Sequence, residues 1–192
     1  MRDFTKIVKK LIDPFLTDKD FVYSDGYYKI EQPNGIRLMV AFDNGGIDSN
    51  SFNIMLLVNS VELDDDKGAH CICYFTGGSI SSSPRKISCH DKNSLNSGLQ
   101  RFIDQYDQVV EPYFSSFTNC SDIADKLSND IELSSYVGDL YLVSGKIPEA
   151  KKSYKAWIEH LPTIQRLDKS KVEKAIDETN AKIKKCELIN RA

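Results

Sequence analysis

Cysteine and histidine residues gather in two short stretches, and these residue types bind zinc or act as nucleophiles. The stretches are His70-Cys71-Ile72-Cys73 and Cys89-His90. A structural zinc site needs about four such ligands, with cysteines spaced by about two to four residues in a turn. Cys71 and Cys73 are only one residue apart, within a run typical of a strand, and His70 lies on the opposite face. We therefore interpret these thiols as buried apolar groups and expect neither a metal nor a cofactor.

A nucleophilic cysteine needs a base within reach and a lowered thiol pKa. Cys89 and His90 are adjacent in the sequence, and neighbouring side chains need not face each other. An enzyme with a site formed by Cys71, Cys73, Cys89 and His90 is therefore the third of our three functional hypotheses. The sequence predicts no catalytic residue.

Glycines, hydroxyls and cations follow one another between residues 77 and 86, and together such groups can bind a phosphate. Gly77-Gly78 precedes Ser81-Ser82-Ser83-Pro84-Arg85-Lys86. Neither GxxxxGK[ST] nor GxGxxG occurs, and the strand–loop–helix context of those motifs is missing. We therefore interpret residues 77–97 as a mobile connection.

Acidic residues near two predicted turns form the candidate partner-binding surface. They lack the alternating spacing of an EF-hand, so we expect no calcium site. Such carboxylates would meet the basic surface that a nuclease needs for its substrate. The predicted surface consists of Glu62, Asp64, Asp65, Asp66, Asp43 and Asp48.

The predicted elements are one helix, then a group of strands, then a group of helices. Apolar residues recur at helical spacing from Phe4 to Phe15, and Pro14 predicts that this helix ends or kinks near Asp13. Short loops between the following strands favour an antiparallel sheet of about four to five strands over parallel crossovers. From about Ser94 the pattern becomes helical. Segregated strands and helices indicate the α+β class.

The C-terminal helices include a predicted αα-hairpin. The segment from Gly138 to Tyr154, with Gly145 at the turn, resembles one tetratricopeptide-type hairpin, in which small residues let two helices approach closely. We predict a sheet domain over residues 1–127 and a helical extension over 128–192 packed on it. A scaffold or adaptor that binds its partner through residues 133–161 is the second functional hypothesis.

Composition excludes several classes of protein. A hydrophobic content of 41% is too high for a disordered chain, and a net charge of −3 is too near neutral for a general nucleic-acid binder. No apolar run approaches the roughly 20 residues of a membrane span. Residues 1–127 carry a net charge of −5 and residues 128–192 carry +2. The charged start of the chain predicts no secretory signal, and hence a cytoplasmic protein with reduced thiols.

The N-terminal part of the chain carries the features of a known family. An amphipathic helix ends in Pro14-Phe15-Leu16, Asp20-Phe21 stands where the family usually has Gly-Phe, and an aromatic hairpin precedes the apolar run 53–58. With these features, residues 1–120 resemble the bacterial "domain of unknown function 4304" group. Small α+β proteins of this kind also resemble immunity proteins of bacterial toxin systems, which bind and block one cognate toxin.

The resemblance implies a binding role and brings no catalytic residues with it. The leading hypothesis is therefore a cytoplasmic protein-binding module, namely an immunity protein that blocks a bacterial toxin. Its expected partner is a protein such as a toxin nuclease domain. We expect it to bind neither nucleic acid nor a membrane directly.

Overall fold

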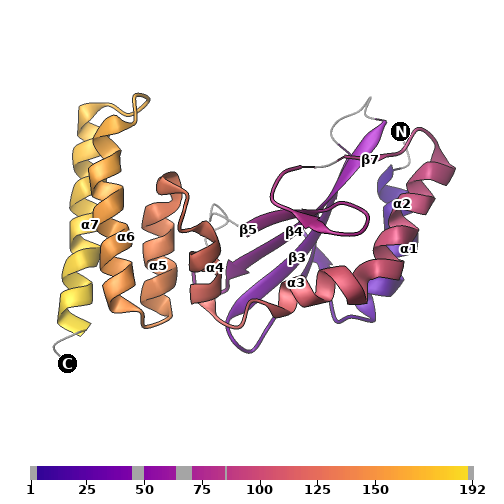
Figure 1. The fold of residues 1–192 in the computed structure, drawn as a ribbon, viewed down its shortest axis with the longest axis horizontal. Helices are drawn as coiled ribbons and strands as arrows, with labels where there is room; N and C mark the ends of the chain where they lie inside the picture. The colour runs from indigo at the N-terminus through magenta and orange to yellow at the C-terminus, as the bar shows by residue number, and fades with distance from the viewer. Residues whose placement is uncertain (1–3, 45–49, 64–70, 85, 190–192) are drawn as a thin grey trace. The chain divides into compact units, whose positions relative to one another are not determined.

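The chain folds as an N-terminal helix, an antiparallel sheet and a series of C-terminal helices (Figure 1). This computed structural model describes residues 4–44, 50–63, 71–84 and 86–189. The predicted α+β class and the order of its elements are confirmed. The chain forms two compact units: unit 1 is Met1–Val58 with His70–Phe117, and unit 2 is Asn59–Ala69 with Thr118–Ala192.

The sheet is a meander in which each strand lies beside the strand before it. Its spatial order is β1 (Val22–Ser24), β2 (Tyr27–Glu31), β3 (Ile36–Asp43), β4 (Ser51–Ser60), β5 (Cys71–Phe75) and β6 (Ile80–Ser81), while β7 (Ile87–Ser88) pairs with β4. The interpretation of residues 77–97 as a mobile connection was wrong, because this segment forms β6, β7 and the start of the next helix. Strands of two residues are too short to show a period in the sequence.

Helices α1 (Phe4–Thr17) and α2 (Lys92–Gln105) cover one face of the sheet (Figure 1). Phe102 of α2 packs edge-on against Phe42 of β3 and Phe75 of β5, with ring centroids 5.5 Å apart in both pairs. Phe4 of α1 lies 5.8 Å from Phe52 of β4 in the same way. Four of these five rings are buried, so this face forms the main core of unit 1.

Helix α1 does not end at Asp13 as predicted, but continues to Thr17 with Pro14 inside it. A proline within a helix costs about 3 kcal/mol, because it removes one backbone hydrogen bond and crowds the preceding turn. Ile12 and Leu16 lie one turn apart on the same side of the helix and are fully buried. Their burial offsets the cost of the proline, and the expected end of the helix at Asp13 was therefore wrong.

The apolar stripe that begins at Leu95 is divided among three helical segments. After α2 come a π-helical turn, η1 (Tyr106–Val110), and α3 (Glu111–Ser115). Tyr106 is buried, and its ring packs 5.8 Å from that of Phe102. Phe114 of α3 packs against Phe21, which precedes β1, with ring centroids 6.3 Å apart.

In unit 2, consecutive helices pack against one another in chain order (Figure 1). They are α4 (Cys120–Leu127), the 3-10 turn η2 (Ile131–Leu133), α5 (Ser134–Val143), α6 (Ile147–His160), the 3-10 turn η3 (Leu161–Thr163) and α7 (Lys169–Ile189). The predicted αα-hairpin is present as α5 and α6. Gly145 joins the two helices with a φ of +73°, a conformation that favours glycine.

Helix α5 approaches α6 closely because Gly138 has no side chain. A Cβ at this position would lie 2.4 Å from Cε1 of the fully buried Tyr154. The Tyr154 hydroxyl donates to Asp139 Oδ1 at 2.7 Å, and Lys182 Nζ lies 2.6 Å from Asp139 Oδ2. Burial raises the pKa of Tyr154, and the bond to Asp139 raises it further. Asp139 therefore joins side chains from α5, α6 and α7.

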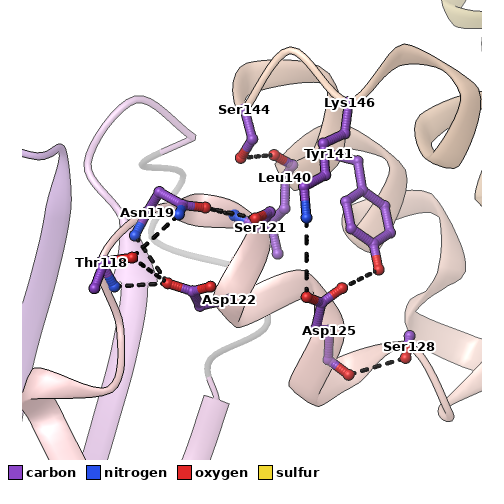
Figure 2. A network of polar contacts seen from close by, with 10 residues as sticks. All are labelled: Thr118, Asn119, Ser121, Asp122, Asp125, Ser128, Leu140, Tyr141, Ser144 and Lys146. Carbon is purple, nitrogen blue, oxygen red and sulfur yellow. Dashed lines mark hydrogen bonds and ion pairs between the residues drawn. The ribbon is translucent and has the colours of Figure 1, made fainter.

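A polar network fixes the start of unit 2 (Figure 2). Asn119 caps α4 by accepting from Ser121 N at 2.8 Å, and Asp122 accepts from Thr118 N at 2.7 Å. Farther along α4, Asp125 accepts a hydrogen bond of 2.6 Å from the Tyr141 hydroxyl of α5. The cap and this interhelical bond together set how α4 lies against α5.

We predict that Gly138→Ala destabilises unit 2, by roughly 1–3 kcal/mol, because the added methyl overlaps the Tyr154 ring. Urea unfolding followed by circular dichroism measures the loss. The matched control is Gly78→Ala, whose new Cβ would meet nothing nearer than Gln105 Oε1 at 3.9 Å. Equal stability of the two variants would contradict the packing described here.

We predict that Asp122→Ala destabilises the protein by about 1 kcal/mol at neutral pH. Burial acts to raise the pKa of Asp122, but hydrogen bonds from Thr118 and Asn119 outweigh it and lower the pKa from its ordinary value of 3.8.

Because the folded-state pKa is depressed, this stabilisation is present above pH 4 and disappears as the pH falls through the folded pKa. Urea unfolding at pH 7 and at pH 2.5 should show a difference between wild type and Asp122→Ala that shrinks in acid. The exposed Asp177→Ala is the control and should change stability little at either pH. A difference independent of pH would rule out the carboxylate cap as its cause.

Candidate functional site

A second apolar cluster lies on the sheet face opposite α1 and α2, which we call the second face. Because side chains alternate along a strand, the residues next to the core phenylalanines point to this face. The cluster consists of Met39 and Ala41 of β3 and Leu57 of β4, with Tyr27 and Met55 packed against it. This sheet therefore carries apolar side chains on both of its faces. An antiparallel sheet with one solvated face usually carries polar side chains there.

Strand β5 extends the second face beyond this cluster. Ile72 pairs with Leu57, and Tyr74 pairs with Met55. The side chain of Ile72 is 41% exposed, and those of Met55 and Tyr74 are half-buried. The second face therefore presents apolar and aromatic groups that remain accessible.

An unpaired polar atom also belongs to the second face. Asn53 of β4 alternates with Phe52 and Ile54, which point into the main core. Asn53 is 8% exposed, and its Oδ1 has no hydrogen-bond partner within the described residues. Leaving a buried acceptor unpaired costs about 1–3 kcal/mol.

The predicted acidic surface is only partly within the described residues. Asp43 is the exposed last residue of β3 in unit 1, and Glu62 is exposed in the turn after β4, in unit 2. Asp48 and Asp64–Asp66 lie outside the described residues. Counted by sequence, unit 1 carries a net charge of −1 and unit 2 a net charge of −2. The charge difference between residues 1–127 and 128–192 therefore does not separate the two units.

The cysteines and histidines are placed as follows. Cys73 lies opposite Leu56 in the sheet, on the side of the main core, and Cys89 is buried just after β7. His90 is exposed, and its Nε2 lies 3.1 Å from Ser88 Oγ. His70 and the side chain of Cys71 lie outside the described part of the chain. Among the described residues, no group of three or more His, Cys, Asp or Glu could hold a metal ion.

The glycine- and serine-rich segment forms one side of a cavity in unit 1. The cavity measures about 600 Å³ and lies between the β5–β6 hairpin, β7 and α2. Its lining residues are Thr76, Gly77, Lys86, Ile87, Ser88, Ser94, Ser97, Gly98 and Arg101. The sequence analysis had weighed Gly77 and Lys86, and the structure brings both to this cavity.

Helix α2 supplies the residues of this cavity that the sequence analysis missed. Ser94, Ser97, Gly98 and Arg101 follow the i, i+3, i+4, i+7 spacing of one helix face. This polar and small stripe runs beside the apolar stripe that packs on the sheet. A search for polar as well as apolar periodicity would have found it.

Comparison with known proteins adds no relative to this picture. No family model matches the chain, and no curated protein and no solved structure matches it either. The resemblance of residues 1–120 to the "domain of unknown function 4304" group therefore stays a prediction. Within the described residues, no helix is long and apolar enough to cross a membrane.

We predict that Cys89 and Cys186 resist alkylation at neutral pH in the folded protein. Both are almost fully buried, and burial raises the pKa of each thiol, so little thiolate forms. Iodoacetamide labelling followed by peptide mass spectrometry should show modification only after unfolding in urea. Rapid labelling of native Cys89 would instead identify it as a reactive thiol and favour the enzyme hypothesis.

Proposed function

We propose that this chain is a protein-binding module whose partner docks on the second face of the sheet. One observation carries the proposal: Ile72 is exposed and Met55 and Tyr74 are half-buried, beside an apolar cluster whose own central side chains are already buried. A soluble sheet with one covered face usually carries polar side chains on the other, so apolar groups there need another explanation. Contact with another protein supplies one.

The residue types on the second face suit a protein partner. Met and Tyr are enriched in protein interfaces, and the flexible thioether of Met55 can adapt to a neighbouring surface. Tyr74 offers a large apolar ring with a hydroxyl that can still form a hydrogen bond.

In the form of this proposal that follows from the family resemblance, the chain is an immunity protein and the partner is a bacterial toxin domain. The protein would act by steric occlusion of the toxin's active site. Asp43 belongs to the predicted acidic surface and is exposed at the end of β3. Because side chains alternate between the two faces along a strand, Asp43 lies on the second face. It would meet a basic residue of a nuclease partner.

We predict that Ile72→Asp weakens binding at least tenfold, measured against the protein that co-purifies with the wild-type chain. The substitution puts an unpaired charge at the accessible end of the apolar cluster. Size-exclusion chromatography and isothermal titration measure the complex. The control is Leu188→Asp, because Leu188 is equally apolar, 68% exposed and located on α7. Binding that survives Ile72→Asp but not Leu188→Asp would overturn the docking face.

The adaptor hypothesis remains the second candidate function, because the packing of α4 to α7 in chain order is the arrangement of stacked helical hairpins. The same binding assay separates it from the first. Lys152→Glu and Lys155→Glu change exposed residues of α6 and leave the second face intact. Loss of partner binding in these variants, with Ile72→Asp unaffected, would favour the adaptor.

A further inference from the structure

We propose that the cavity between the β5–β6 hairpin, β7 and α2 binds the phosphate group of a small organic phosphate monoester. This site is separate from the second face, and it holds whether or not the proposed docking function is correct. The proposal rests on the charge of the lining, on its uncommitted donors and on its size.

The charge of the lining is positive. Lys86 and Arg101 are both exposed at the cavity, and none of the described residues that line it is acidic. The acids of α2 and its cap have other partners. Asp91 accepts from Ser94 N at 2.8 Å and from Ser94 Oγ at 2.9 Å, and Asp104 accepts from Gln100 at 2.8 Å. The two cations are therefore left to attract an anion from solution.

Three donors of the lining have no hydrogen bond or ion pair to any other described residue: the Lys86 ammonium, the Arg101 guanidinium and the Ser97 hydroxyl. The other three hydroxyls are already engaged, because Thr76 bonds to Ser79, Ser88 bonds to His90 and Ser94 bonds to Asp91. Two charged donors and one neutral donor match a phosphate, whose three terminal oxygens are strong acceptors.

Gly77 leaves room for the side chain of Arg101 beside the hairpin. A Cβ at Gly77 would come within 3.2 Å of both Cδ and Nη1 of Arg101, and the backbone φ of +85° further favours glycine there. The arginine side chain therefore lies across the hairpin at the edge of the cavity. The planar guanidinium can then pair with two oxygens of one phosphate, which a lysine ammonium cannot do with the same geometry.

The size of the cavity argues for an organic ligand. Cavities of about 300–1,000 Å³ accommodate whole small molecules, and this one measures about 600 Å³, far more than an inorganic phosphate needs. Ile87 provides an apolar wall, and its Cγ2 lies only 3.0 Å from the position of a Cβ at Gly98. Strand β7 therefore packs closely on α2 where both line the cavity.

The test is titration of the full chain with ribose 5-phosphate, with ribose and with inorganic phosphate, at constant ionic strength. Heteronuclear NMR reports which amides shift, and isothermal titration gives the affinity. We expect saturable binding of ribose 5-phosphate, with shifts confined to residues around Gly77, Lys86 and Ser97. Inorganic phosphate should bind to the same residues more weakly, and ribose should not bind.

Arg101→Gln and Lys86→Gln should each weaken binding of ribose 5-phosphate at least tenfold, and Ser97→Ala should weaken it less. All three side chains are exposed or at the cavity edge, so thermal unfolding should be nearly unchanged. The controls are Arg166→Gln and Lys155→Gln in unit 2, which should leave the affinity unchanged. Non-saturable binding, or equal loss of affinity in the control variants, would overturn the proposed site.

Discussion

The packing of one ring, that of Phe102, determines how unit 1 is arranged. This fully buried side chain of α2 contacts Phe15 of α1, Phe42 of β3, Phe75 of β5 and Tyr106 of η1, each edge-on. Such aromatic pairs contribute roughly 0.5–1.5 kcal/mol each beyond the burial of their area. Because the partners belong to α1, to η1 and to two strands, the position of Phe102 fixes the helix layer on the sheet.

Both proposed binding features follow from this placement of α2. With its apolar stripe turned to the sheet, the neighbouring stripe of Ser94, Ser97 and Arg101 must face the β5–β6 hairpin and β7. The ring contacts of Phe102 hold α1 and α2 on one side of the sheet. The cluster around Leu57 lies on the opposite side, where these contacts place neither helix. The cavity and the second face are thus two consequences of one packing arrangement.

The parts of the fold that the sequence predicted are those with a strong local period or a distinctive turn. The alternating run from Ile36 to Phe42 became β3, and the glycine turn at Gly145 joined α5 to α6. Pro14 favours an end of the helix by local propensity alone, which does not register that Ile12 and Leu16 are both fully buried. Tertiary burial decided the length of α1, and a single sequence does not contain that information directly.

The candidate site was harder to predict for a different physical reason. Gly77 and Lys86 lie within ten residues of each other, but Arg101 comes from a helix whose approach depends on β7, a strand of two residues. That strand is formed by pairing with Phe52 and Ser51, more than thirty residues earlier in the chain. Phosphate motifs that sequence patterns detect are contiguous, whereas this constellation exists only after the sheet has closed.

In unit 2, polar contacts specify how α7 packs against its neighbours, where apolar burial alone specifies little. Of the described residues of α7, only Thr179 and Cys186 are buried, so burial alone provides little preference for one register of this helix. Lys182 bonds to Asp139 of α5, and Lys151 of α6 bonds to Glu187. Neither ion pair is fully buried, so each avoids the large desolvation cost of an interior charge while still requiring one alignment. The geometry of α7 therefore depends on charge placement, whereas that of α5 and α6 depends on the missing side chain of Gly138.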